Sequence, residues 1–257
     1  MGLRASSKTA PGQTTLAYKA VHACAATCVP MLRNEFTLPQ ALAALDPMRL
    51  DERPFDLYAP GWLFEIKYDG ARLMAQFGEG KASLMTRNGA DATKWFPEVA
   101  ERLATVPGGP HIVDGEMCVL DDLGRSNYYK LRARAKRRRW YGGADDATYC
   151  VFDLLVEDGV NLMSRPLTER KRRLADLVGP AAQSVFYVQH SEDQGRELMA
   201  QAAALGLEGL VAKRADSCYD PGFRSPEWVK IKSTQVTKTP ALAPAEPGDG
   251  EVPISQF

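Results

Sequence analysis

The sequence has no excess of either charge and no long apolar run. Lys and Arg together number 32, as do Asp and Glu, so the net charge indicates neither an acidic nor a basic partner. A nucleic-acid surface must therefore come from a local cluster of basic residues. No stretch reaches the roughly 18 to 20 consecutive apolar residues that a membrane helix needs, so we expect no membrane partner.

Cysteine is sparse and irregularly spaced, and no internal repeat is visible. Five cysteines over 257 residues do not predict a framework of disulfides and favour a reducing, cytoplasmic location. Hydrophobic residues make up 45% and charged residues 25% of the chain, as in ordinary globular proteins. We divide the chain into an N-terminal extension (1–40), a folded domain (41–236) and a flexible tail (237–257) rich in Pro, Ala and Gly.

Strand patterns dominate the folded domain. The expected strands are 62–67, 71–77, 81–86, 111–120, 148–155, 209–213 and 228–232. Gly78, Glu79 and Gly80 suit a hairpin turn between the second and third of them. Because strands outnumber helices and do not alternate regularly with them, we expect an α+β fold with antiparallel sheets rather than a doubly wound fold.

Two helices carry signals at their ends. Pro97 opens a short helix over 98–104, at the position where its missing N–H costs least. Ser191 and Gln194 form a capping box that predicts a helix over about 192–205, and Gly206 would end it.

Lysines at strand ends are the first candidates for chemistry. Lys67 ends a predicted strand in EIKYDGAR (65–72), but surface lysines at such positions are common, so this segment alone is a weak signal. Lys230 and Lys232 lie two apart in a predicted strand and therefore share one face. They repel each other unless an anion such as phosphate lies between them. The alternative is a solvent-facing edge strand whose lysines prevent aggregation.

Acidic and aromatic residues on other strands extend the set. Asp114 and Glu116 share one face of their strand, which suits a ribose hydroxyl pair, a divalent cation or a basic partner. Glu208 directly precedes an apolar strand. Phe152 lies in a hydrophobic run, where an aromatic ring is usually part of the core but could also stack on a purine at a pocket wall.

The segment 130–139 is basic at seven of its ten positions and is followed by Trp140 and Tyr141. Such a segment can be a solvated helix face. The density of basic residues and the two aromatics favour instead a contact that follows a nucleic-acid backbone.

Six segments in order resemble the motifs of the covalent nucleotidyltransferases, which comprise ATP-dependent DNA ligases, RNA ligases and mRNA capping enzymes. The ligase module of bacterial end-joining DNA ligases is the nearest likeness, and it covers roughly 46–233. Each motif is weak alone, but six in this order make coincidence very improbable. The segments are EIKYDGAR, LMTRNGAD, VDGEMCVLDDLGR, VFDLL, EGLVAKRADSCYDPGFRSPEW and WVKIK.

The resemblance implies an ATP-grasp-like α+β fold in which two antiparallel sheets enclose a nucleotide cleft. It implies that Lys67 attacks the α-phosphate of ATP and forms a covalent lysyl-AMP, with Asp69 supporting the lysine loop. Mg²⁺ (or Mn²⁺) would be held by Glu208 and Glu116. The residues expected to bind the nucleotide are Glu65, Ile66, Arg72, Glu116 (ribose), Phe152 (adenine), Lys230 and Lys232 (α-phosphate).

The implied partner is nicked or broken duplex DNA. Arg87 would contact the 5′-phosphate of a nick and Arg224 is a weaker candidate, while Arg137, Arg138 and Arg139 would add basic contacts. Full ligases continue into an OB-fold domain. Only 24 residues follow position 233, so we expect no OB-fold and poor sealing without a partner. We expect a monomer in the bacterial cytoplasm near the nucleoid, assisted by a separate DNA-binding or end-joining protein.

Two alternatives share parts of this pattern. An RNA ligase or a GTP-using capping enzyme uses the same lysine chemistry. A DNA-end-binding accessory protein would keep the scaffold without turnover, although every candidate catalytic position holds a chemically competent residue.

Overall fold

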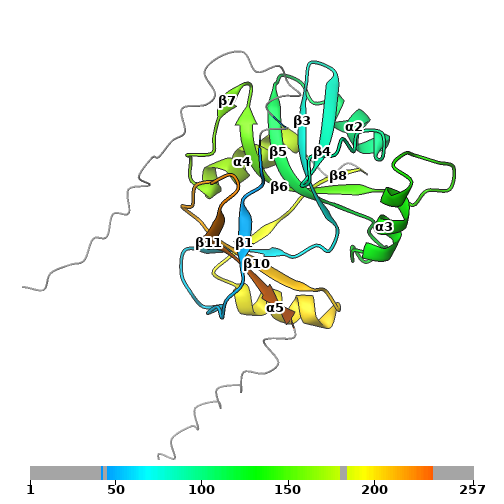
Figure 1. Cartoon of the computed structure of the whole chain (residues 1–257). Helices are drawn as coiled ribbons and strands as arrows, with labels where there is room; N and C mark the ends of the chain where they lie inside the picture. The colour runs from blue at the N-terminus through cyan, green and yellow to red at the C-terminus, as the bar shows by residue number, and fades with distance from the viewer. Residues whose placement is uncertain (1–41, 43–44, 180–183, 234–257) are drawn as a thin grey trace, which may run out of the picture.

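Two β-sheets pack face to face in the computed structural model, which describes residue 42 and residues 45–179 and 184–233 (Figure 1). The predicted extension and tail lie outside the described residues. The first sheet has the order β1 (Arg49–Asp51), β11 (Arg224–Lys232), β10 (Gly209–Arg214), β2 (Trp62–Ile66) and β9 (His190–Glu192). The second has the order β4 (Lys81–Thr86), β3 (Ala71–Gly78), β5 (His111–Cys118), β6 (Thr148–Glu157) and β7 (Val160–Asn161), with β8 (Val185–Tyr187) also beside β6.

The strand pairing is antiparallel except at two places. β1 runs parallel to β11 and β8 runs parallel to β6, while the other pairs of the two sheets are antiparallel. The expected α+β class with antiparallel sheets is confirmed. None of the helices in the described part of the chain is long and apolar enough to cross a membrane.

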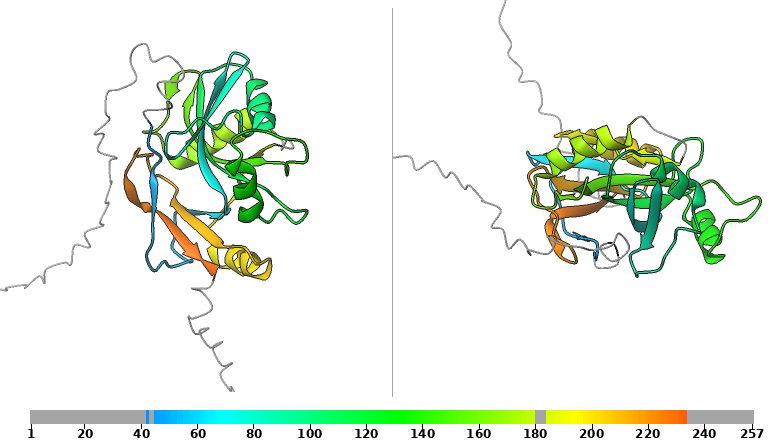
Figure 2. Two further views of the ribbon diagram at one scale, coloured as in Figure 1. Left: turned by 45° about the vertical axis from the view of Figure 1, so that its right-hand side comes forward. Right: turned by 90° about the horizontal axis from the view of Figure 1, so that it is seen from above.

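Helices cover the outer faces of both sheets (Figures 1 and 2). α4 (Leu167–Val178) packs on β6 and α2 (Pro97–Ala104) on β4, whereas α5 (Gly195–Ala204) packs on β10 of the first sheet. α3 (Tyr128–Lys136) follows β5 and lies at the side of the second sheet. Because a helix covers each outer face, the inner faces of the sheets are left to meet each other.

The core where the sheets meet is built from alternate residues of their strands. Trp228 of β11 is fully buried and lies in one apolar cluster with Met74 of β3, Ile112 of β5 and Leu155 of β6. Residues two apart in a strand share a face, so Lys230 lies on the same face of β11 as Trp228 but farther along the strand, where it is only partly buried. Burying a large apolar side chain stabilises a fold by roughly 1.5 to 3 kcal/mol, so this cluster joins the sheets firmly.

Most element predictions are confirmed, with modest shifts of the ends. Glu79 and Gly80 form the predicted turn with positive φ angles of 53° and 75°, and Pro97 occupies the first turn of α2. β11 begins at Arg224, four residues before the predicted start, because β1 pairs beside its first residues.

The predicted capping box was wrong. Residues 190–192 form β9, which pairs with β2, and α5 begins at Gly195 without a side-chain cap. The Ser191 hydroxyl donates instead to the side-chain oxygen of Gln194 at 3.1 Å. Gly195 lies against Phe64, where a Cβ atom would come within 2.5 Å of the ring. Strand pairing with β2 therefore overrides the local capping signal.

The chain passes from the first sheet to the second at residues 67–70. The Lys67 N–H donates to the carbonyl of Gly209 at 3.0 Å, which extends the pairing of β2 and β10 by one residue. Gly70 approaches β5 so closely that a Cβ would lie 2.1 Å from the Met117 carbonyl oxygen. The crossing is thus fixed at both ends, and Lys67 lies at the boundary between the sheets.

Candidate active site

A cavity of about 450 Å³ opens between the two sheets around this crossing. Nine of the residues predicted to form the site line it, although they come from six separate segments of the chain. They are Glu65, Ile66, Lys67, Arg72, Arg87, Glu116, Phe152, Arg224 and Lys230. The predicted residues Asp69, Glu208 and Lys232 lie beside lining residues, whereas the basic run 137–139 is not part of the cavity wall.

Lys67 is paired with a carboxylate. Its Nζ atom lies 2.5 Å from Oε2 of Glu208, and the two side chains are 19% and 32% exposed. Burial and then repulsion by Glu208 raise the pKa of Asp69, which places Asp69 in the same electrostatic cluster. The Asp69 N–H donates to the Ser126 hydroxyl at 2.9 Å, so the loop that follows Lys67 is held to the segment after β5.

The acidic pair on β5 divides into two different environments. Asp114 is fully buried and accepts two hydrogen bonds from Arg72, at 3.0 and 2.6 Å, and a third from the Tyr219 hydroxyl at 2.6 Å. We considered a ribose, a divalent cation or a basic side chain as the partner of Asp114 and Glu116, and Asp114 binds a basic side chain, that of Arg72. Glu116 lines the cavity, and burial raises its pKa to about 7 although Arg72 and Lys67 oppose the shift.

Lys230 and Lys232 project together, as their spacing predicts, and an anion lies between them. That anion is the carboxylate of Glu52, with distances of 2.7 Å to Lys230 Nζ and 3.5 Å to Lys232 Nζ. The hydrogen bond from Lys230 lowers the pKa of Glu52. β11 lies between β1 and β10, so the alternative of an edge strand is wrong. A carboxylate of the protein therefore lies between the lysines, at the position that we predicted for phosphate.

Lys213 is a cavity residue that the sequence reasoning missed. It is fully buried, and its Nζ lies 2.6 Å from Glu65 and about 4 Å from the ring centroids of Phe152 (4.1 Å) and Trp228 (4.2 Å). Burial lowers the pKa of Lys213 to about 8, although Glu65 opposes the shift. Its place in the motif segment EGLVAKRADSCYDPGFRSPEW could have indicated it, and strand parity agrees, since Val211, two residues earlier on β10, also lines the cavity.

Glu65 has two lysine partners rather than an open carboxylate. Its other oxygen lies 2.5 Å from Lys171 of α4, and the side chain is almost completely buried. Burial favours the neutral carboxyl, but Lys171 and Lys213 outweigh it and lower the pKa of Glu65. Glu65 nevertheless lines the cavity together with Phe152 and Trp228, so it offers an ionised hydrogen-bond acceptor to a ligand.

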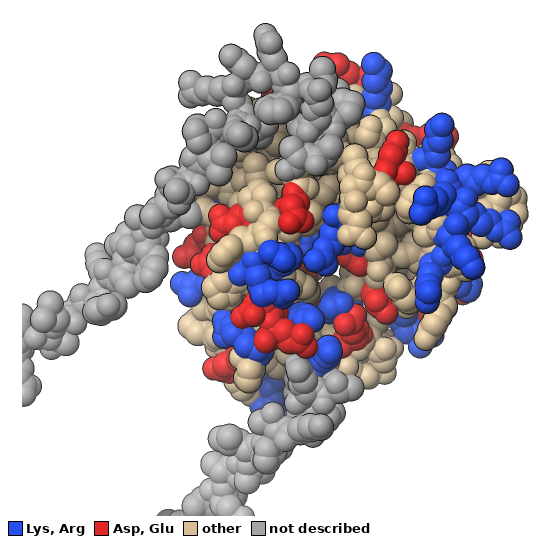
Figure 3. Space-filling model, in the orientation of Figure 1, with Lys and Arg blue, Asp and Glu red and all other residues tan. Residues whose placement is uncertain are grey.

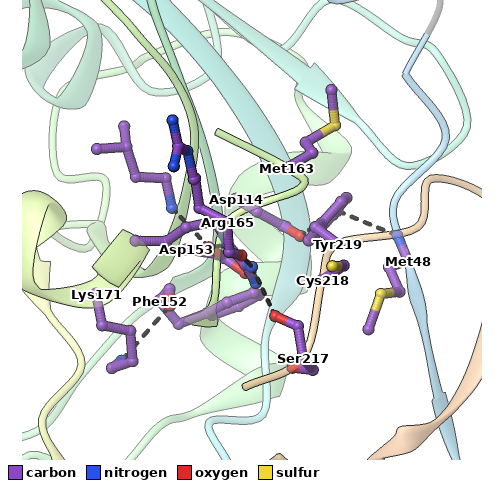
Figure 4. A network of polar contacts seen from close by, with 12 residues as sticks. Met48, Asp114, Phe152, Asp153, Met163, Arg165, Lys171, Ser217, Cys218 and Tyr219 are labelled. Atoms are coloured by element: carbon purple, nitrogen blue, oxygen red, sulfur yellow. Dashed lines mark hydrogen bonds and ion pairs between the residues drawn. The ribbon is translucent and has the colours of Figure 1, made fainter. Parts of the chain in front are cut away.

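A buried network supports the wall that carries Phe152 (Figure 4). Arg170 of α4 donates to both oxygens of Asp153, at 2.8 and 2.9 Å, and to the Ser217 carbonyl at 2.8 Å. Arg170 and Asp153 are both completely buried. Because β6 alternates, Asp153 points to α4 while its neighbour Phe152 faces the cavity.

Arg87 and Arg224 approach the cavity from opposite sheets. The Arg87 N–H donates to the carbonyl of Arg72 at 3.3 Å, just after β4. The Arg224 guanidinium donates to the carbonyl of Leu50 at the start of β11. Both residues line the cavity and are exposed, so they place two positive charges at its wall for a further anion.

The basic run divides into structural and exposed residues. Arg134 is 1% exposed and binds Glu98 at 2.6 Å and the Trp95 carbonyl at 3.2 Å, and it also donates to the Asp145 carbonyl. Arg137 stacks on Tyr141, with 3.9 Å from guanidinium carbon to ring centroid. Figure 3 shows the exposed members as a basic cluster at the side of the molecule.

Arg134→Ala should therefore destabilise the protein, by about 3 kcal/mol, because it removes one partner of a buried ion pair and leaves backbone carbonyls without donors. Urea unfolding measures this. Arg132→Ala on the same helix is the control, since Arg132 is exposed and should change stability by less than ~0.5 kcal/mol. Equal effects of the two substitutions would contradict the structural role of Arg134.

Comparison with known proteins identifies the family. Residues 44–232 match the family described as ATP dependent DNA ligase domain. The chain belongs to this family. The predicted resemblance and the nucleotidyltransferase fold are confirmed.

Relatives in bacteria and archaea support this membership. The chain is 35% identical over 172 residues to a multifunctional non-homologous end joining protein of Pseudomonas aeruginosa, covering 66% of this chain and 20% of that protein. It is 34% identical over 190 residues to a DNA ligase of Natronomonas pharaonis, covering 72% of this chain and 34% of that one. The chain thus spans about a fifth to a third of the length of these relatives.

Solved structures show the same fold. A mycobacterial DNA ligase D complexed with ATP and MES superposes with a TM-score of 0.63 and 30% identity, covering 74% of this chain and 60% of that chain. A Chlorella virus DNA ligase-adenylate, at 13% identity and a TM-score of 0.54 over 73% of this chain and 68% of that chain, shows likeness of fold alone.

Proposed function

We propose that this domain transfers AMP from ATP to Lys67, with Mg²⁺ (or Mn²⁺), as the first step in joining nicked or broken duplex DNA. One observation carries the proposal. Lys67, held 2.5 Å from Glu208, shares a cavity with the cations Arg72 and Lys230 in a chain of the ATP-dependent DNA ligase family. A nucleophile among cations is the arrangement that phosphoryl transfer needs.

The chemistry follows from the atoms that line the cavity. Nζ of Lys67 attacks the α-phosphorus of ATP, an N–P bond forms and the bond to the pyrophosphate oxygen breaks. Pyrophosphate leaves with the bonding electrons, and the proton of the nitrogen passes to solvent by way of the Glu208 carboxylate, which lies 2.5 Å from Nζ. A free lysine has a pKa near ~10.4, so deprotonation precedes attack. Lys230 and Lys232 replace Glu52 with the phosphate oxygens and stabilise the negative charge that develops on them.

Glu208 and Glu116 supply the oxygen donors that Mg²⁺ takes in proteins, and this ion usually completes its shell with water and substrate phosphates. Among the described residues no group of three or more acidic, histidine or cysteine side chains is placed to hold a metal alone, which agrees with a site completed by substrate. Bound Mg²⁺ would neutralise phosphate charge. Asp69 supports the lysine loop through its backbone bond to Ser126.

The remaining lining residues suit the nucleoside. Glu116 of β5 lies opposite Arg72 of β3 in the sheet and would bind the ribose hydroxyls. Phe152 and Ile66 give the aromatic and aliphatic walls for adenine. Glu65 is acceptor-only, which suits the amino group of adenine and repels the O6 atom of guanine.

Arg87 and Arg224 at the cavity wall are our candidates for the 5′-phosphate of the DNA. The name of the Pseudomonas relative supports a broken end as substrate and an end-joining protein as partner. Membership of the ATP-dependent DNA ligase family supports DNA rather than RNA as the nucleic acid.

The test is incubation of the pure protein with α-³²P-labelled ATP or GTP, followed by addition of nicked duplex DNA. ATP should label the protein and GTP should not, because Glu65 selects adenine. The label should then move to the DNA. Labelling by GTP would indicate a capping enzyme, transfer only to nicked RNA would indicate an RNA ligase, and absence of label would indicate a non-catalytic accessory protein.

Sealing by this chain should be weak and strongly sensitive to salt. The proposed DNA contacts are exposed arginines, and at ~150 mM salt the Debye length is about 8 Å, so such contacts are largely screened. Sealing assays from low to physiological salt measure this. Efficient multiple-turnover sealing at ~150 mM salt would show that tighter DNA contacts exist.

Replacing Arg137, Arg138 and Arg139 with glutamine should weaken binding to nicked DNA and lower the slope of log affinity against log salt by up to ~3. The reason is that each basic contact to a phosphate releases counterions from the DNA, so a variant that makes fewer such contacts releases fewer counterions when it binds. Fluorescence anisotropy at several salt concentrations measures the slope, and self-adenylation should be unchanged because these residues lie outside the cavity wall.

The control for this prediction is Arg172→Gln. Arg172 is an exposed arginine on α4 that pairs with Asp176, so its loss should leave the slope unchanged. If the triple variant keeps the slope of the unmodified protein, the basic run is a solvated helix face.

A further inference from the structure

The outer side of α3 presents an aromatic and two basic side chains in line. Tyr129, Arg132 and Lys136 are spaced by three and four residues, so they share one side of the helix. The opposite side carries the buried Leu131 and Arg134. Tyr129 is 81% exposed, which is unusual for a large aromatic side chain with an apolar body.

A second exposed aromatic follows the helix. Trp140 is 56% exposed. Its backbone N–H donates to the Lys94 carbonyl at 3.1 Å, and this hydrogen bond fixes the position from which the indole projects. We call Tyr129, Arg132, Lys136 and Trp140 together the α3 stripe. The helix of nine residues is about 13 Å long, so the stripe covers a length of more than one nucleotide.

The positive charge of the stripe is not compensated within the described part of the molecule. The ion pairs of the run 130–139 in that part involve Lys130 with Asp145 and Arg134 with Glu98. Arg132 and Lys136 have no ion pair there and are exposed. Charge complementarity therefore points to an anionic partner.

The exposed rings decide which anion fits. Phosphates alone would be met by basic side chains, but an exposed aromatic ring offers a face on which an unpaired base can stack. The bases of a duplex are already stacked on each other and cannot reach such a ring. Basic residues interleaved with aromatics are the pattern of single-stranded nucleic-acid grooves.

The stripe begins beside the proposed catalytic loop. Ser126, which binds the backbone of Asp69, lies two residues before α3, and Asn127 caps the helix by accepting from the Lys130 N–H at 3.1 Å. The basic cluster and the central hollow lie on the same face in Figure 3. A strand that leaves the cavity can therefore continue across α3.

We propose that the α3 stripe binds the unpaired strand of a DNA end, with bases stacked on Tyr129 and Trp140 and phosphates paired with Arg132 and Lys136. This inference rests on the proposed function for its choice of DNA, and it adds that the preferred substrate is an end with an unpaired stretch.

The experiment measures binding of the full chain without ATP, so it is independent of self-adenylation. The probes are a fluorescein-labelled oligothymidylate of about 15 nucleotides and the same strand annealed to its complement as a blunt duplex. Fluorescence anisotropy compares the unmodified chain with the double variant Tyr129→Ala, Trp140→Ala. Tyr129→Phe keeps the stacking face, and Tyr58→Ala removes an exposed tyrosine (64%) outside the stripe.

The double variant should bind the single strand at least about tenfold more weakly, since stacking contributes roughly five- to 150-fold per base. It should bind the duplex within about twofold of the unmodified chain, and its salt slope should not change because no charge is lost. Tyr129→Phe and Tyr58→Ala should bind like the unmodified chain. Equal losses on both probes, or no loss on the single strand, would overturn the inference. A protein that fails to label with AMP yet shows this pattern would refute the proposed function alone.

Discussion

Lys67→Ala should abolish the transfer of AMP from ATP to the protein. No other described lysine combines the strand-end position with the cavity wall and a carboxylate partner at 2.5 Å. The fold should persist, because Lys67 lies at the cavity wall rather than in the core and the Glu208 side chain, 32% exposed, can be hydrated once its partner is gone. Labelling with α-³²P-ATP measures the transfer, and thermal unfolding monitors the fold.

Lys67→Arg is the matched variant for this prediction. A guanidinium keeps the positive charge beside Glu208 but remains protonated and cannot attack phosphorus, so labelling should also be lost. Lys81→Ala, which removes an exposed lysine at the start of β4, should label normally. Acid-labile, hydroxylamine-sensitive label that persists in Lys67→Ala would assign the nucleophile to another lysine.

Replacing either Lys230 or Lys232 with alanine should slow self-adenylation by roughly 10²- to 10³-fold, the scale for the loss of one preorganised group that stabilises developing charge. Lys230 should have the larger effect, because it lines the cavity and lies closer to the shared anion, at 2.7 Å against 3.5 Å. Single-turnover labelling rates at saturating ATP measure the effect.

Glu52→Gln is the control for the lysine pair. It removes the carboxylate and keeps both ammonium groups, so charging should not become slower. If both lysine variants label within about threefold of the unmodified rate, the two lysines serve only to hold Glu52 and the segment after β1.

The long strands could be predicted from the sequence because their alternation is local. The strand over 81–86 was predicted to the residue, and the parity of Lys230 and Lys232 placed both side chains correctly. The three-residue strands β1, β8 and β9 were not predictable in this way, because each forms only by pairing with a strand that is distant in the sequence. β9 also accounts for the failed capping box at Ser191.

The site was predictable as a set of residues but not as a set of pairs. The motif resemblance identified nine of the residues that line the cavity, yet their partners depend on the packing of the two sheets. Lys171 reaches Glu65 from α4 over a sequence separation of 106 residues, and Tyr219 reaches Asp114 over 105. Glu52 belongs to none of the motif segments, so no local pattern indicates that it lies between Lys230 and Lys232.

Because of these pairings, a nucleotide that binds as proposed must replace carboxylates of the protein as the partners of three of the cavity's cations. It does not meet these cations as unpaired positive charges. Lys67, Arg72 and Lys230 each already have a carboxylate of the protein, from Glu208, Asp114 and Glu52. A small inorganic anion would have to break such contacts with few new ones in return. A nucleotide brings a base, a ribose and several phosphates at once, so it can replace several internal partners together. Under the proposed function, the number of simultaneous contacts would therefore favour ATP over small inorganic anions such as phosphate and chloride.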